Sequence, residues 1–137
     1  MASKPVMTAV ETRLAANWTH TPIRTQNAAD GSVPSDGNAF LFVDYPVAVE
    51  DQASIGSPGA NLWRETGGFR IAIAIPIGAG IDPWAARIDT LRGVFRGKVF
   101  DGVRTYQASP PIEDGETDDG AFYVLSFAVA YDYDLIG

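Results

Sequence analysis

The densest group of side chains that could do chemistry is a run of carboxylates in the last third of the chain: Glu113, Asp114, Glu116, Asp118 and Asp119. A calcium loop needs ligands at fixed alternate positions, a glycine for its turn and a closing bidentate glutamate, which this spacing does not supply. Glycosidase chemistry needs two carboxylates held rigidly across a cleft, and a segment with Gly115 and Gly120 is a poor scaffold for that. The run predicts a solvated acidic loop, with a docking surface for a basic partner as the alternative.

Residue types that usually hold metals, cofactors or nucleophiles are scarce. The chain has no cysteine and a single histidine, His20, which excludes disulfides, thiolate metal sites and a multi-histidine metal site within one chain. Gly78-Ala79-Gly80 stands between an expected strand and an expected helix, but Pro83 occupies the position of the third glycine of a dinucleotide fingerprint. No recognisable motif gives His20 a serine or carboxylate partner, so a structural role is favoured. We expect no catalytic residue, no metal, no cofactor and no enzymatic activity.

The balance of charge constrains the partners. The 137 residues include 10 basic and 17 acidic side chains, for a formal net charge of −7. Binding of nucleic acid through phosphate neutralisation needs clustered Lys and Arg on one face, and here they are scattered. An acidic balance keeps a surface soluble and would also let DNA pass without sticking. The longest apolar run, residues 71–79, is far shorter than the ~20 residues that span a bilayer, and no secretion signal opens the sequence, so we expect synthesis in the cytosol and no membrane partner.

Alternation of large and small side chains identifies the strands. In residues 69–77, one face of the expected strand has Arg70, Ala72 and Ala74. The other face has the large side chains Phe69, Ile71, Ile73 and Ile75. Residues 121–133 repeat this pattern with aromatic and aliphatic side chains on one side. The apolar run at residues 39–45 predicts a strand buried on both faces, which Pro46 ends or places at a sheet edge, with extension past a kink through Val47 and Val49 as the alternative. Asp101-Gly102 predicts a tight hairpin over residues 98–106.

Two stretches have the apolar spacing of amphipathic helices. Residues 4–18 follow Ser3 as the expected capping residue. Their apolar stripe consists of Met7, Val10, Leu14 and Trp18. The second helix is expected to have Asp82 as N-cap and Pro83 as its first residue, and to end at Gly97. Its buried stripe is expected to consist of Trp84, Ile88, Leu91 and Phe95. The length fits one ordinary domain. We therefore expect a single α+β domain over residues 1–137, a mainly antiparallel β-sheet with two α-helices packed on one face.

The remaining segments predict loops and candidate contact surfaces. Residues 27–38, 50–61 and 107–120 are rich in Asp, Gly, Ser and Pro. Residues 23–27 suit a short extended piece, and residues 62–65 suit the start of a strand beside the central one. Aromatic residues at strand ends are common in interfaces, although core packing is the alternative for each of them alone. The candidate contact residues are those of the two later loops and their borders: Asp51, Trp63, Glu113, Asp114, Glu116, Asp118 and Asp119.

The opening of the chain resembles a family of small tailed-phage proteins. The segment Glu11-Thr12-Arg13-Leu14-Ala15-Ala16-Asn17-Trp18 ends a helix in tryptophan, and Thr21-Pro22-Ile23 and Gln26-Asn27 follow it. With the order of the later elements, this pattern resembles the lambda-type tail terminators. The resemblance implies a mixed α/β subunit of a hexameric ring that caps the tail tube, stops its polymerisation and joins the tail to the head connector. The extended segments 27–38 and 107–120 depart from the family pattern.

The same resemblance implies partners and a location. The partners are further copies of the chain, the major tail tube protein and a head–tail connector or stopper protein at the head-proximal end of the virion tail, with DNA passing through unbound. A ring needs a heterologous interface that closes, which exposed strand edges could supply. We expect residues 50–61 and 107–120 to face the tube or connector, so that deletion of residues 113–119 would impair joining and leave the monomer folded. A different connector, stopper or minor tail protein is the alternative, followed by a small-molecule-binding enzyme.

Overall fold

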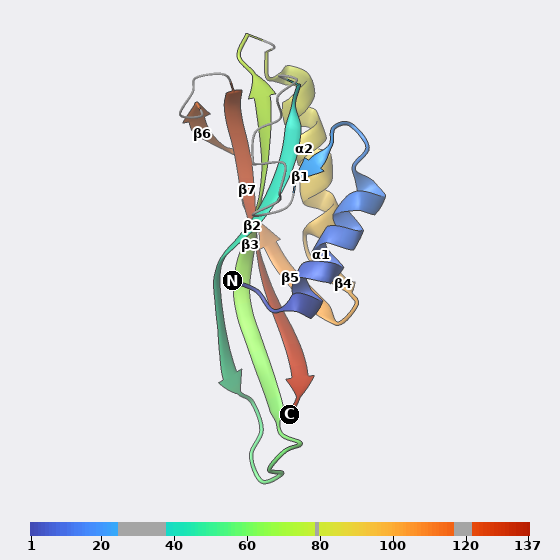
Figure 1. The fold of residues 1–137 in the computed structure, drawn as a ribbon, viewed down its shortest axis with the longest axis vertical. Coiled ribbons are helices and arrows are strands. Elements are labelled where there is room, and N and C mark those ends of the chain that lie inside the picture. Colours follow the sequence, from blue (N-terminus) through green and yellow to red (C-terminus); the bar gives the residue numbers. More distant parts are fainter. Residues whose placement is uncertain (25–37, 79, 117–121) are drawn as a thin grey trace.

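The computed structural model describes residues 1–24, 38–78, 80–116 and 122–137 as one mixed sheet with two helices (Figure 1). The sheet order is β1-β2-β3-β7-β5-β4, and β6 also pairs with β7. Every pairing is antiparallel except that of β1 with β2, which is parallel. The predicted α+β class is confirmed, with a sheet that is mixed rather than purely antiparallel. In chain order the elements are α1 (Lys4–Asn17), β1 (Ile23–Arg24), β2 (Phe40–Gln52), β3 (Leu62–Pro76), α2 (Asp82–Phe95), β4 (Val99–Phe100), β5 (Val103–Ala108), β6 (Ile112–Glu116) and β7 (Phe122–Ile136).

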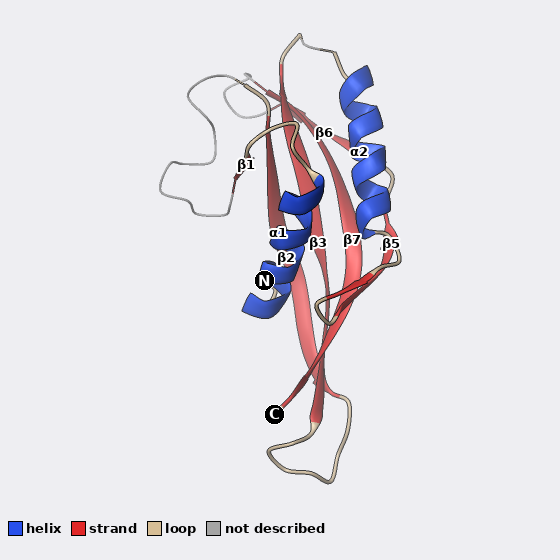
Figure 2. Cartoon of the chain, turned by 90° about the vertical axis from the view of Figure 1, so that its right-hand side faces the viewer, coloured by secondary structure: helices blue, strands red, loops and turns tan. Residues whose placement is uncertain are grey.

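Both helices cover the same face of the sheet, as predicted (Figures 1 and 2). Helix α1 buries Val6, Ala9, Val10 and Leu14, whereas Met7 is only partly buried. Helix α2 begins at Asp82 with Ile81 as N-cap, one residue earlier than predicted, and buries Ile88, Leu91 and Phe95. Neither helix of the described ranges is long and apolar enough to cross a membrane.

Strand β3 lies at the centre of the core. Its predicted large-residue face is confirmed, because Phe69, Ile71, Ile73 and Ile75 are all buried against the helices. The Phe69 ring has its centroid 5.4 Å from that of Phe95 on α2 and 6.1 Å from that of Tyr131 on β7. The Tyr45 ring of β2 lies 6.5 Å from the Phe69 ring. Phe69 therefore joins three strands to α2.

The start of α1 is held by the sheet instead of by its own capping side chain. Ser3 occupies the N-cap position, but its hydroxyl makes no capping hydrogen bond, contrary to the prediction. The Ser3 backbone N–H donates to Oε2 of Glu65 on β3 at 3.2 Å, and the Tyr131 hydroxyl donates to the same oxygen at 2.6 Å. Burial and this hydrogen bond raise the pKa of Tyr131. Glu65 is only 5% exposed, so water has little access to this site. The Glu65 carboxyl group therefore serves as the hydrogen-bond acceptor for the Ser3 N–H and the Tyr131 hydroxyl.

Glu65→Ala is expected to lower the free energy of unfolding by about 1–3 kcal/mol, because the buried Tyr131 hydroxyl and the Ser3 N–H both lose their acceptor. Glu65→Gln keeps an oxygen at nearly the same place and should cost clearly less. Urea denaturation of the two variants beside the parent chain measures both losses. Equal losses of unfolding free energy for Glu65→Ala and Glu65→Gln would show that Glu65 does not stabilise the protein by accepting these hydrogen bonds.

Strands β2 and β3 are longer than the sequence predicts. Strand β2 continues through Pro46 to Gln52, and its register against β3 shifts between Asp44 and Val47, which is a β-bulge that accommodates the proline. Residues 62–76 form one strand, so the expected separate strand at 62–65 is the start of β3, and the predicted loop 50–61 is reduced to 53–61. As a result, β2, β3 and β7 continue past Glu65, which contacts Ser3 at the start of α1, and their far ends extend past both helices (Figures 1 and 2). We refer to residues 47–68 and 130–137 of these three strands as the arm.

The prediction of a loop at residues 107–120 is wrong, because two strands occupy part of this range. Strand β5 continues to Ala108, and β6 pairs with β7 from Ile112 to Glu116. Deletion of residues 113–119 would therefore remove a strand, which contradicts the expectation of an undisturbed monomer. The predicted hairpin is confirmed, because Asp101 and Gly102 have φ angles of 49° and 84° between β4 and β5. The predicted loop 27–38 lies, apart from residue 38, outside the described residues.

Candidate functional site

A network of charged side chains lies on the arm and on β5 beside it, on the face of the sheet opposite to the helices. Arg64 of β3 donates to Asp134 of β7 at 2.7 Å, and Arg104 of β5 donates to Asp134 at 3.0 Å and also to Asp132. The Tyr106 hydroxyl donates to Asp132 as well. Arg64 stands opposite Asp134, and Arg104 opposite Asp132, in the strand register. The network thus joins three neighbouring strands of the sheet.

The pH dependence of stability should report on this network. Hydrogen bonds from Arg64 and Arg104 lower the pKa of Asp134 from 3.8 to about 2 against the opposing effect of burial. Because folding favours the carboxylate, its contribution is complete above the unfolded pKa of 3.8 and is lost as the pH falls toward about 2. Solvent screens these groups, so the loss should be at most about 1 kcal/mol.

Asp134→Asn is expected to flatten this part of the stability profile. Urea unfolding of the variant and the parent chain at several pH values from ~6 to ~2 measures the difference. The two curves should converge at the acid end, where Asp134 of the parent chain is protonated. Curves that stay parallel over the whole range would contradict the assigned shift.

A second charged group lies toward the other end of the sheet. Arg70 of β3 contacts Asp44 of β2 at 3.0 Å and also forms an ion pair with Asp114 of β6. Its guanidinium carbon lies 5.7 Å from the centre of the Phe42 ring. Burial opposes ionisation of Asp114, but its hydrogen bonds, including that with Arg70, lower its pKa. Asp114 therefore ties β6 to the central strand and does not belong to a free acidic loop.

The predicted contact residues divide between two ends of the molecule. Asp51 is exposed near the end of β2, and Trp63, on β3 beside it, is half-buried and donates from Nε1 to the Gly137 carbonyl at 3.1 Å. Glu113, Asp114 and Glu116 lie on β6 at the opposite end (Figure 1). Asp118 and Asp119 lie outside the described residues. The two predicted contact regions are therefore separate surfaces, and no cluster of three or more potential metal-binding side chains occurs within the described ranges.

The arm carries exposed apolar side chains that the sequence analysis did not single out. Val47 and Val49 on β2 are 55% and 57% exposed, and Ile55 in the turn is 88% exposed. Strand β1 pairs with β2 only at Leu41 and Phe42, and no other strand of the described ranges pairs with that edge of β2. The alternation of Val47 and Val49 beyond Pro46 is the sequence signal from which this apolar surface could have been predicted. The arm thus offers a strand edge and apolar surface to another chain.

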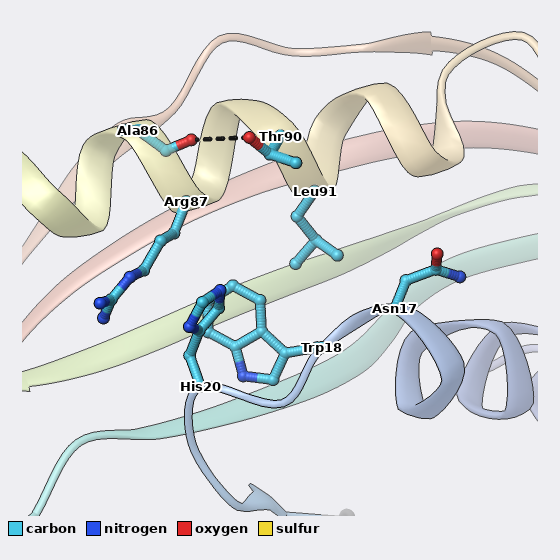
Figure 3. Close-up of a pocket in the computed structure, with 7 residues that line it drawn as sticks. All are labelled: Asn17, Trp18, His20, Ala86, Arg87, Thr90 and Leu91. Atoms are coloured by element: carbon cyan, nitrogen blue, oxygen red, sulfur yellow. Dashed lines mark hydrogen bonds between the residues drawn. The ribbon is translucent and has the colours of Figure 1, made fainter.

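A pocket of about 180 Å³ opens between the end of α1 and the side of α2 (Figure 3). Trp18 and Leu91 are its buried apolar part, and His20 packs edge-on against Trp18 with ring centroids 5.0 Å apart. The Arg87 guanidinium carbon lies 4.6 Å from the centre of the Trp84 ring. Small-molecule sites usually measure about 300–1,000 Å³, so this pocket is better matched to one side chain of a protein partner. The lining residues are Asn17, Trp18, His20, Ala86, Arg87, Thr90 and Leu91.

Comparisons with known proteins add information about the fold only. No family model matches the sequence, and a search of curated proteins finds no match. A solved structure that carries only a sequence identifier as its name superimposes with a TM-score of 0.55. The two sequences are 21% identical, and the alignment covers 97% of this chain and 96% of that one. This protein is therefore similar in fold, over nearly its full length, to a structure of unstated function.

Proposed function

We propose that the chain is the subunit of a tailed-phage tail terminator, which forms a hexameric ring on the tail tube, ends its polymerisation and provides the surface for head joining. The resemblance of residues 11–27 to that family supports the choice of function. The structural observation that carries it is the arm, which extends beyond both helices with exposed valines and an edge of β2 that pairs with no other described strand past Phe42.

A ring of identical subunits needs two different surfaces that fit each other. One such surface is the arm, because exposed strand edges pair readily with other chains and Val47 and Val49 add apolar area to that edge. The other lies elsewhere on the molecule, so each subunit can use its arm on one neighbour and receive the arm of the next. Such an assembly closes into a ring when the rotation between neighbours is a whole fraction of a turn, and the resemblance implies six subunits.

The proposed neighbours follow from this position. The tube protein would contact one side of the ring and the connector or stopper protein the other, at the head-proximal end of the tail. A chain with a net charge of −7 would repel DNA phosphates and allow the genome to pass through. The protein would act by complementary shape, without catalysis or a bound metal.

Deletion of the gene tests this function, because tubes without a terminator should grow to uncontrolled lengths that electron microscopy can measure. The parent chain should restore uniform tails, whereas Val47→Asp/Val49→Asp should not, because two charges on the open edge of β2 oppose strand pairing. Val99→Asp is the matched control, since Val99 is 75% exposed on β4, at the opposite edge of the sheet from β2.

Two results would contradict the proposal in different ways. Uniform tails of normal length in the deletion strain would show that the chain does not end tube growth. If those tails also failed to join heads, the alternative of a connector or stopper would be favoured. Rescue by the double aspartate variant as complete as by Val99→Asp would show that the edge of β2 is not part of the assembly.

A further inference from the structure

We propose that the turn at the end of the arm docks into the pocket between α1 and α2 of a neighbouring copy, with Ile55 as the inserted side chain. This inference rests on the proposed function, because it names the contact that would link successive subunits of the ring. The observations behind it are the shape of the turn, the chemistry of the pocket, the charges beside both and their positions in the fold.

The turn presents Ile55 in a fixed backbone frame. The Asn61 side chain accepts a hydrogen bond from the Ser57 N–H at 3.1 Å, and the Ser54 hydroxyl accepts one from the Leu62 N–H at 2.7 Å. The Ala53 N–H donates to the Leu62 carbonyl at 2.7 Å. These bonds close the turn around Ile55, which is 88% exposed. A large apolar side chain on such a preorganised turn loses little conformational entropy on docking.

The pocket suits an aliphatic side chain. Trp18 and Leu91 provide its apolar surface, while Thr90 and Asn17 line its side (Figure 3). Its volume of about 180 Å³ is too small for a typical metabolite. Trp18 and Leu91 are nearly buried, so a branched side chain from another copy would cover mainly the apolar atoms of the exposed Ala86 and Thr90, which is favourable by the hydrophobic effect.

Charges beside the turn and the pocket have opposite signs. Glu50 and Asp51 are exposed at the end of β2, next to the turn. Arg87 lines the pocket, and its guanidinium lies over the Trp84 ring. Opposite charges at the rim of an interface speed association and fix its orientation. Docking of Ile55 would bring the carboxylates of one copy toward the guanidinium of the next.

The proposed contact joins two copies, because the turn of one chain cannot reach its own pocket. The contact of Ser3 with Glu65 places the start of α1 against the arm, whereas the pocket lies at the other end of this helix, beyond Asn17. In Figure 1 the turn of the arm lies at the far end of the molecule from the last turn of α1, beside which the pocket opens. The contact is therefore heterologous, and its repetition gives either an open chain of subunits or a closed ring.

Cysteine cross-linking tests the contact without background, since the natural chain has no cysteine. Equal amounts of Ile55→Cys and Thr90→Cys are mixed, assembled and oxidised, and the disulfide-linked peptides are counted by mass spectrometry. Random pairing of the two variants would give 55–90 links as about half of all disulfide links. If the turn docks as proposed, the fraction of 55–90 links should be far above half, because a disulfide forms only between Cα atoms a few ångströms apart. A share of half or less would overturn the proposal.

A charge exchange provides an independent measurement. Arg87→Glu and Asp51→Arg should each weaken self-association about tenfold in sedimentation experiments, and the two changes combined in one chain should restore it. Lys98→Glu is the matched control for the change of charge, because Lys98 is exposed away from the pocket. Single variants that associate like Lys98→Glu, or a double variant that is as weak as either single one, would count against the contact.

Failure of the contact and failure of the proposed function give different results. If tails lose length control without the gene but no excess of 55–90 links forms, the ring uses another interface and this inference is wrong. If the 55–90 links form but tails end normally without the gene, the copies associate as proposed and the terminator function is wrong.

Discussion

Phe69→Ala is expected to lower the free energy of unfolding by about 3–5 kcal/mol. Phe69 is completely buried and contacts the rings of Tyr45, Phe95 and Tyr131. Alanine would remove its contacts with β2, α2 and β7 and leave a cavity that the surrounding sheet cannot close. Chemical denaturation followed by tryptophan fluorescence measures the loss.

The matched control for this variant is Val99→Ala. Val99 is 75% exposed on β4, so its truncation should change stability by no more than about 0.5 kcal/mol. A loss below about 1 kcal/mol for Phe69→Ala would show that the ring cluster does not hold the helices to the sheet.

Gly67→Ala is expected to separate β2 from β3 in the arm, with a cost of about 1–3 kcal/mol or more. A Cβ atom at position 67 would lie 2.3 Å from the Val47 carbonyl oxygen and 2.9 Å from Ala48 Cα. Both are backbone atoms next to the bulge of β2, so they cannot rotate away as a side chain could. Hydrogen exchange should show faster exchange of the amides in residues 47–52, while the core of β3 and β7 stays protected.

Gly93→Ala is the control for the added methyl group. A Cβ atom at position 93 would meet nothing within 4 Å, and the residue lies inside α2, so alanine there should stabilise the protein by up to about 1 kcal/mol. Under the proposed function, Gly67→Ala should also weaken ring formation, whereas Gly93→Ala should not. Unchanged amide protection in the arm of Gly67→Ala would contradict the steric explanation.

The sequence was sufficient where a pattern is local and periodic. Alternation over residues 69–77 predicted the buried face of β3, and the spacing of Ile88, Leu91 and Phe95 predicted the buried face of α2. The turn at Asp101-Gly102 was predictable because few other residues adopt its backbone angles. In each case, the side chains that specify the element are contained within it.

The errors occurred where distant residues decide the structure. Strand β6 has the acidic, glycine-containing composition of a loop, but pairing with β7 and the ion pair between Asp114 and Arg70 place it in the sheet. Pro46 left the end of β2 undecided, and a bulge against β3 allows the strand to continue to Gln52. The ion pairs of Arg64 and Arg104 depend on strand register, so sequence placed Asp51 and Trp63 near a turn but could not predict the network beside them.

Under the proposed function, the Glu65 oxygen that accepts from both Ser3 and Tyr131 has a mechanical consequence for the assembled ring. Because Ser3 and Tyr131 both donate to it, tension applied to the arm by an adjoining subunit would be transmitted directly to the first turn of α1. Capture of the arm and retention of the N-terminal helix would then reinforce each other by thermodynamic linkage. Proteases should accordingly trim the N-terminus of free subunits faster than that of incorporated ones.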